Sequence, residues 1–184
     1  MFLTIFDEIE KATSVILREV DGEAPEQRAD RICDEVLEML IDMYLLGWNE
    51  YPFGNEVDPD RMYDSVYEVV AGKTWEERIR EYVLNDGTPA DIARVIDTET
   101  HRVINQGIFD AADVAQDVNG LRVSKTWVTM QDLRVRDTHD YLEGVTIPLK
   151  DRFYTYDDDS ARYPGDFSKP ENNVNCRCVL KLTW

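Results

Sequence analysis

Cysteine, histidine and basic residues are scarce in this chain. Its 184 residues include three Cys and two His, and 20 Lys and Arg stand against 38 Asp and Glu, which gives a formal net charge of −18. So few cysteines, two of them separated by a single residue, argue against a secreted domain built on disulfides. The excess of acid argues against strong direct binding of nucleic acid by the whole chain, because such binding requires clustered Lys and Arg.

The sequence also has no segment suited to a membrane. Its N-terminus has no basic region, and Asp7 and Glu8 interrupt the first apolar run, so the pattern is not that of a signal peptide. No stretch approaches the roughly 20 apolar residues that a bilayer-spanning helix needs. We therefore expect no membrane partner, and we expect the protein to be made in a reducing cytoplasm.

Short motifs typical of enzymes are missing as well. The chain has no GxSxG, no HExxH and no glycine-rich loop of the kind that holds phosphate. No other group of residues amounts to a catalytic constellation. The sequence thus predicts no catalytic residue and no cofactor, and it favours a protein that is not an enzyme without deciding the question.

The first half of the chain has the apolar spacing of amphipathic helices. Apolar residues recur every three or four positions in residues 2–16 and 32–44. A separate short helix is expected from Asp110 to Asn119. Three further helix starts carry local signals, which are Asp58 before Pro59, the capping box Thr74–Glu77, and Thr88 before Pro89.

After Gly120 the pattern changes to short β-prone runs, which are LRVSKTWVTM, VTIPL, RFYTY and CVLKLTW. Turn signals such as the Tyr-Pro-Gly-Asp sequence at 163–166 separate these runs. Helices followed by strands predict an α+β fold, with a helical N-terminal half and a small, mostly antiparallel sheet domain after it.

The charge is divided in the same way. Residues 1–92 hold 8 Lys and Arg against 23 Asp and Glu, whereas residues 93–184 hold 12 against 15. We place a domain boundary after residue 87. The prediction is an acidic helical extension over residues 1–87 and a compact domain over residues 88–184.

His139, Cys176 and Cys178 are the first candidates for chemistry. Imidazole and thiolate are ligands that suit zinc, and a fourth ligand could come from a nearby Asp or from Cys33. Cysteines one residue apart on a strand point to opposite faces, so we do not expect these two to share one ion. The favoured interpretation is structural, with one Cys in the core and His139 hydrogen-bonded to the backbone. A metal site and a nucleophilic Cys–His pair remain as alternatives.

Two charged runs are also candidates. Residues 132–137 alternate Asp and Arg, which predicts an ion-pair network that fixes a loop against the strands, with anion binding as the alternative. The run Asp157–Asp159 has the hard oxygens that calcium prefers, but it lacks the spacing of an EF-hand. We expect this run to be a solvated turn.

Taken together, the pieces of the last third resemble a known family. They are Lys125-Thr126-Trp127, Asp132, Arg136-Asp137-Thr138-His139, Gly144, Tyr163-Pro164-Gly165-Asp166 and Asn175-Cys176-Arg177-Cys178. Their order and spacing resemble the C-terminal domain of the phage Mu F-like head morphogenesis proteins, the minor capsid or minor head proteins of tailed phages. About residues 90–184 carry the resemblance. We expect a structural role for its motif residues, which are Trp127, Asp132, Arg136, His139, Gly144, Pro164, Gly165, Asn175, Cys176 and Cys178.

The resemblance implies a structural protein of the virion, located in the phage head. Members of the family have low copy number, associate with the portal and act in head assembly, DNA packaging or DNA delivery. The implied partners are the portal protein and other head proteins, with an indirect association to packaged DNA. The alternative is a phage-encoded enzyme or effector, ADP-ribosyltransferase-like or nuclease-like, that uses Arg136, His139 and Cys176. If the chain is a structural head protein, we expect the acidic helices to bind a partner and the Mu F-like domain at 88–184 to be the rigid part.

Overall fold

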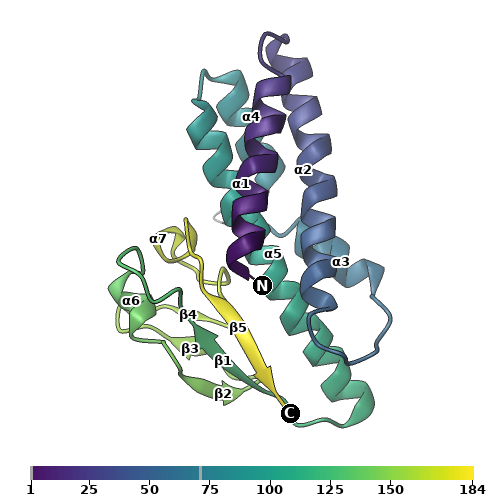
Figure 1. Ribbon diagram of the computed structural model, residues 1–184, viewed down its shortest axis with the longest axis vertical. Coiled ribbons are helices and arrows are strands. Elements are labelled where there is room, and N and C mark those ends of the chain that lie inside the picture. Colours follow the sequence, from purple (N-terminus) through teal and green to yellow (C-terminus); the bar gives the residue numbers. More distant parts are fainter. Residues whose placement is uncertain (1, 71) are drawn as a thin grey trace.

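An elongated helical bundle with a small sheet beside its lower half forms the chain (Figure 1). The computed structural model describes residues 2–70 and 72–184, with side chains from Ile5 onward. The predicted α+β class, helices first and strands after, is confirmed. The helices of the bundle are α1 (Phe2–Glu19), α2 (Pro25–Trp48), α3 (Pro59–Val66), α4 (Trp75–Leu84) and α5 (Pro89–Asn119).

The three predicted helix starts are confirmed by their caps. Asp58 accepts hydrogen bonds from two backbone N–H groups in the first turn of α3. Thr74 forms a complete capping box with Glu77, and Thr88 forms one with Asp91. These side chains satisfy N–H groups that have no partner within the helix, so α3, α4 and α5 begin where local signals indicated.

The prediction of a separate helix from Asp110 is wrong, because α5 continues through Gly107 without a break. A glycine inside a helix normally weakens it. Here the helices need it: a Cβ built at Gly107 would lie 2.3 Å from the carbonyl oxygen of Tyr44 in α2. Gly47 of α2 is placed in the same way, with its built Cβ 2.1 Å from the carbonyl oxygen of Ile104. The two glycines let α2 and α5 pack backbone to backbone.

The sheet is antiparallel, as predicted. Its central strand β1 (Ser124–Val128) pairs with β2 (Thr146–Pro148) on one side and β5 (Val179–Thr183) on the other. Lys125 and Trp127 of β1 point into the protein and are fully buried. The remaining short elements are α6 (Asp137–Asp140), β3 (Phe153–Tyr154), β4 (Ser160–Ala161), which pairs with β3, and α7 (Pro170–Asn173).

Among the residues whose side chains are described, two apolar clusters form the core, and α5 takes part in both. The first cluster joins the helices and includes Ile96 of α5. The second lies between the sheet and the later turns of α5 and includes Ile108. The predicted boundary after residue 87 therefore falls just before a helix that both clusters share, and it stays a prediction.

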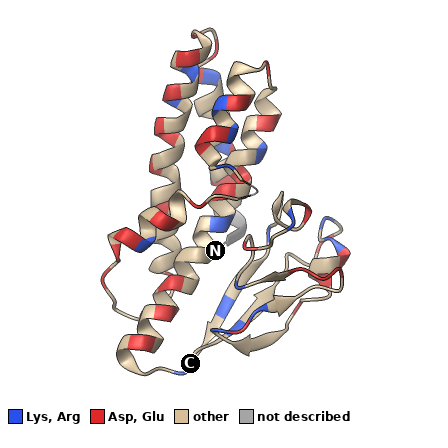
Figure 2. Ribbon diagram, turned by 180° about the vertical axis from the view of Figure 1, so that it is seen from behind, with Lys and Arg blue, Asp and Glu red and all other residues tan. Residues whose placement is uncertain are grey.

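The acidic residues lie mainly on the helices, and the sheet domain carries a more even mixture of signs (Figure 2). This distribution matches the uneven charge of the sequence. Among the residues that the structure describes, no helix combines the length and the apolar character needed to cross a bilayer.

Candidate functional site

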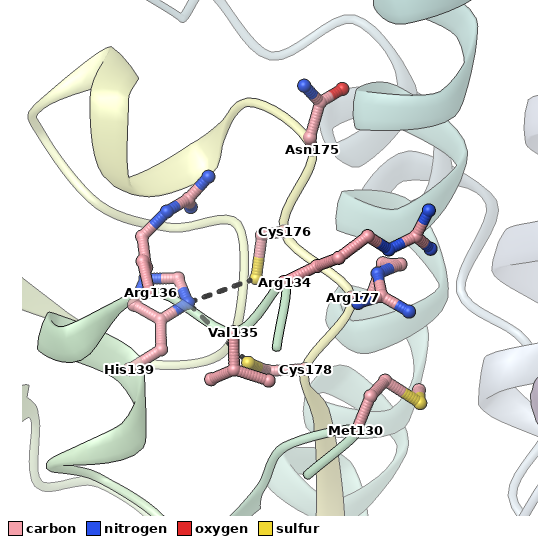
Figure 3. Close-up of a pocket in the computed structure, with 9 residues that line it drawn as sticks. All are labelled: Met130, Arg134, Val135, Arg136, His139, Asn175, Cys176, Arg177 and Cys178. Carbon is pink, nitrogen blue, oxygen red and sulfur yellow. Dashed lines mark hydrogen bonds between the residues drawn. The ribbon is translucent and has the colours of Figure 1, made fainter. Parts of the chain in front are cut away.

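The structure brings His139, Cys176 and Cys178 together in a buried cluster (Figure 3). Nδ1 of His139 lies 3.6 Å from Sγ of Cys176 and 3.5 Å from Sγ of Cys178. All three potential ligand atoms lie within 4.8 Å of one another. The expectation that the side chains of Cys176 and Cys178 point to opposite faces is therefore wrong.

The reason is that the cysteines lie in a loop before β5 and not in the strand itself, which begins at Val179. Asn175 has a left-handed backbone conformation, with φ of 56°, and the N–H of Cys176 donates to the carbonyl of Asn173. Side chains alternate between faces only where the backbone is extended. In this turn both sulfurs point toward the imidazole.

Helix α5 forms hydrogen bonds with the cysteine loop, residues 174–178 between α7 and β5. Nε2 of His101 lies 2.7 Å from the carbonyl oxygen of Cys178, and Nδ2 of Asn105 donates to the same oxygen at 3.2 Å. Oδ1 of Asn105 accepts a hydrogen bond from the N–H of Leu180 at 2.9 Å. His101 and Asn105 are buried and were not among the predicted site residues. A histidine and an amide within the apolar face of a helix are the signal that could have indicated them, since buried polar groups need partners.

Aromatic rings enclose the imidazole of His139. The Trp127 ring meets it edge-on, with centroids 5.4 Å apart and an interplanar angle of 74°. The Phe167 ring stacks on it at 5.3 Å and 22°. Within the described part of the chain, Nε2 of His139 is buried and has no hydrogen-bond partner. The imidazole can therefore make polar contact only through Nδ1, on the side of the two sulfurs.

Positive charge surrounds the open side of the cluster. Arg134, Arg136 and Arg177 line a cavity of about 10 Å³ next to the cysteines. Hydrogen bonds from Cys178 and His139 lower the pKa of the Cys176 thiol well below its usual value, against the effect of burial. The pKa of Cys178 is raised, because its thiol donates to Cys176 and is itself buried. Cys176 is the sulfur that this site keeps most readily as a thiolate.

Of the ion-pair network predicted for residues 132–137, Asp132 forms an ion pair that fixes a loop, whereas Arg136 bonds to backbone carbonyls instead of a carboxylate. Both carboxylate oxygens of Asp132 accept from the guanidinium of Arg177, at 2.7 and 2.8 Å. The guanidinium of Arg136 donates to the backbone carbonyls of Asn172 and Val174, at 3.0 and 2.6 Å. Both links tie the segment before α6 to the loop that carries the cysteines.

The other motif residues lie away from the cluster and shape the chain. Gly144 has φ of 73°, and its N–H donates to the carbonyl of Trp127 at 2.9 Å. Pro164 and Gly165 are buried in the turn after β4. Gly165 has φ of 100°, and a Cβ built there would lie 3.0 Å from Cα of Arg102 in α5. Only a glycine combines this conformation with this close approach.

The prediction of a solvated turn at Asp157–Asp159 is wrong for Asp159, which is 4% exposed. Its carboxylate accepts hydrogen bonds from the backbone N–H groups of Ser160, Ser168 and Lys169, the hydroxyl of Ser168 and the amide of Asn172. These bonds, led by those from Asn172 and Ser168, overcome the effect of burial and lower the pKa of Asp159 to about 2. Asp159 thus connects β4 to α7, the helix just before the cysteine loop.

Comparison with known families identifies the chain. The family model described as Phage Mu protein F like protein matches residues 62–181, which include the whole of α5 and the His–Cys–Cys cluster. This chain belongs to that family. It is accordingly a head or capsid-related protein of a bacteriophage. The resemblance expected from the sequence is confirmed, and the match begins within α3, earlier than residue 88.

One similar curated protein carries the name of an enzyme. It is the NAD(+)--arginine ADP-ribosyltransferase EFV of Enterococcus faecalis strain ATCC 700802 / V583, which is 26% identical over 152 residues. The alignment covers 67% of this chain and 31% of that protein, so the chain spans about a third of the length of its relative. No solved structure matches the chain.

Proposed function

We propose that the chain is a minor head protein of a tailed bacteriophage that associates with the portal and acts in head assembly, DNA packaging or DNA delivery. The observation that supports a docking role is a row of exposed carboxylates on α2, outside the range that the family model matches. Residues 1–61, which include α1 and α2, hold 16 Asp and Glu against 5 Lys and Arg.

This row, the α2 acidic stripe, consists of Asp34, Glu35, Glu38 and Asp42, all of them exposed. Asp34, Glu38 and Asp42 are four residues apart and so lie on one side of the helix. Among the described side chains, the ion pairs of α2 lie at Asp30 and Arg31. The carboxylates of the stripe are therefore free to act on a partner.

A stripe of this kind fits a basic protein surface. Complementary charge steers two proteins together and fixes their register, and the effect weakens as salt screens it. The same stripe repels the phosphates of DNA. We infer that any association with packaged DNA is indirect and passes through the portal or another head protein.

Binding of the full chain to the portal protein of the same phage tests this proposal. We expect neutralisation of the stripe (Asp34→Asn, Glu38→Gln and Asp42→Asn together) to weaken binding by about tenfold, with the larger loss at low salt. A matched control neutralises three exposed carboxylates of the sheet domain, Asp140→Asn, Asp151→Asn and Glu171→Gln. It should bind like the wild type.

The outcomes are distinct. Failure of the wild-type chain to bind the portal protein or to appear in purified virions would refute the proposed association. Equal weakening by both triple variants would show that net charge matters and the stripe does not.

A second candidate function, an ADP-ribosyltransferase-like or nuclease-like activity, has the name of the Enterococcus faecalis relative in its favour. Of the three residues suspected for it, His139 and Cys176 face each other, but Arg136 is engaged with two backbone carbonyls. The head-protein function is the conclusion we favour. Incubation of the full chain with labelled NAD⁺ and an arginine-containing acceptor is expected to transfer no label. Transfer that His139→Ala abolishes without loss of folding would reverse this conclusion.

A further inference from the structure

The two distances from Nδ1 of His139 to the sulfurs of Cys176 and Cys178 are those of a metal-bound set. Zinc binds imidazole nitrogen at about 2.0–2.1 Å and thiolate sulfur at about 2.3 Å, so tetrahedral geometry places the nitrogen and each sulfur roughly 3.6 Å apart. The observed distances from Nδ1 of His139 to the two sulfurs are 3.6 and 3.5 Å. An ordinary N–H···S hydrogen bond accounts for one such contact, but here a single nitrogen faces two sulfurs.

We propose that the chain binds one zinc ion through Nδ1 of His139 and the thiolates of Cys176 and Cys178. The fourth ligand is a water molecule in the adjoining cavity, whose volume of about 10 Å³ has room for a single water. Two thiolates and an imidazole are soft or borderline donors, which select zinc over calcium or magnesium.

The surroundings of the cluster suit this ion. Arg134, Arg136 and Arg177 lie around the cavity and favour deprotonated sulfur. His101 and Asn105 fix the carbonyl of Cys178 and so hold the loop in the conformation that aims both sulfurs at His139. The aromatic rings of Trp127 and Phe167 keep the imidazole in one orientation. Ligands held in place in this way bind metal more tightly than ligands that must first be ordered.

The bound ion links two segments that are far apart in the chain. His139 belongs to α6 in the connection between β1 and β2, whereas the cysteines immediately precede β5. A metal bond between them would stabilise the edge of the sheet domain next to α5, because binding to the folded state alone adds to the free energy of unfolding. The role is structural, and it is independent of whether the α2 acidic stripe binds the portal.

Metal binding by the reduced full-length protein tests the proposal directly. Protein produced without a polyhistidine tag and without chelators is expected to contain about one equivalent of zinc by elemental analysis. Replacement of zinc by Co²⁺ is expected to give the visible absorption of tetrahedral cobalt with thiolate ligands. Removal of the metal with a chelator should lower the Tm of the wild-type protein, and added Zn²⁺ should restore it.

Two serine variants assign the ligands. Cys178→Ser is expected to lose the cobalt–thiolate absorption and to weaken zinc binding by at least about tenfold. Cys33→Ser is the matched control, because Cys33 is also a buried free thiol but lies in α2, outside the cluster. It should keep the absorption and the full zinc content.

Three results would overturn the proposal. One is reduced wild-type protein that takes up less than roughly a tenth of an equivalent of zinc when saturated, a measurement that does not depend on any variant folding. Another is a Cys176–Cys178 disulfide whose reduction yields protein that still binds no metal. The last is a cobalt–thiolate absorption that Cys33→Ser removes and Cys178→Ser keeps.

Discussion

Gly107 of α5 lies directly against the backbone carbonyl oxygen of Tyr44 in α2, so that a Cβ built on the glycine would lie 2.3 Å from that oxygen. On an exposed helix surface, exchanging glycine for alanine stabilises a protein by about 1 kcal/mol through helix propensity. At this crossing the new methyl group meets backbone, which cannot rotate aside. The steric effect should therefore exceed the gain in propensity.

We accordingly predict that Gly107→Ala lowers the free energy of unfolding by about 2–3 kcal/mol, the upper part of the range for overpacked cores. Urea denaturation of the full chain measures it. Val118→Ala, at an exposed position of the same helix, should change the free energy by less than about 0.5 kcal/mol. A Gly107→Ala variant as stable as the wild type would mean that α2 and α5 are not held at this distance.

The pKa of Asp159 predicts how the stability of the fold changes at acidic pH. The folded-state pKa of about 2 lies below the ordinary value of 3.8, so the charged carboxylate stabilises the fold above about pH 4 and this stabilisation is lost as the pH falls toward 2. Asp159→Asn replaces an acceptor oxygen by an N–H donor that faces other donors. We expect it to cost about 3 kcal/mol at pH 7.

The variant should also lose less further stability than the wild type between pH 4 and pH 2. Denaturation curves at several pH values in this range give the comparison. Asp158→Asn is a close control, because the neighbouring Asp158 is exposed and its left-handed conformation, with φ of 60°, is one that Asn tolerates. Equal acid sensitivity of wild type and Asp159→Asn would refute the assigned role.

The parts of the fold that depend on neighbouring residues could be predicted, and the parts that depend on distant ones could not. The capping boxes at Thr74 and Thr88 are complete within four residues, and the structure forms both. The continuity of α5 depends instead on a carbonyl of α2 that lies far away in the sequence from Gly107. A local pattern carries no information about such a contact, and the sequence pattern predicts a separate helix from Asp110 instead.

In the candidate site, too, the features that depend on distant residues could not be predicted. The residue types of His139, Cys176 and Cys178 make metal binding an alternative to the favoured structural role. The predicted orientation of the two cysteines is wrong, because they lie in a loop and not in an extended strand. In that loop, which follows the left-handed turn at Asn175, both sulfurs lie near the imidazole. The support from α5 depends on tertiary packing, as does the buried carboxylate of Asp159.

Lys125 leads to a prediction at neutral and basic pH. Its ammonium is buried over the rings of Phe109 and Phe153, at 4.9 and 5.3 Å, and donates to the carbonyl of Arg162 at 2.7 Å. Burial lowers the pKa of Lys125 from 10.5 to about 7. Between these values the unfolded chain binds more protons than the folded one, so this group makes stability rise with pH.

We therefore expect the wild type to gain stability from pH 6 to pH 9 and Lys125→Met to show a smaller gain. Urea denaturation at four pH values across the range measures the slope. Lys181→Met removes an exposed lysine from β5 and should keep the wild-type slope. Parallel profiles for the wild type and Lys125→Met would show that Lys125 does not change its protonation in this range.

Arg136 and Asp132 allow a test of how the cysteine loop is held. The Arg136 guanidinium is partly buried and donates to two backbone carbonyls, so Arg136→Met leaves two acceptors without their donor and should cost about 2 kcal/mol. Asp132 forms an exposed ion pair with Arg177, whose loss in Asp132→Ala should cost less than about 1 kcal/mol.

Thiol alkylation tests which of these two contacts holds the cysteine loop. Because Arg136 holds the carbonyls just before the cysteines, Arg136→Met should expose Cys176 to alkylation under native conditions, whereas Asp132→Ala should leave it protected. Arg134→Met, which changes another residue of the same cavity, serves as the control and should behave like Asp132→Ala. Equal alkylation rates in all three variants would mean that the backbone hydrogen bonds of Arg136 do not hold the loop.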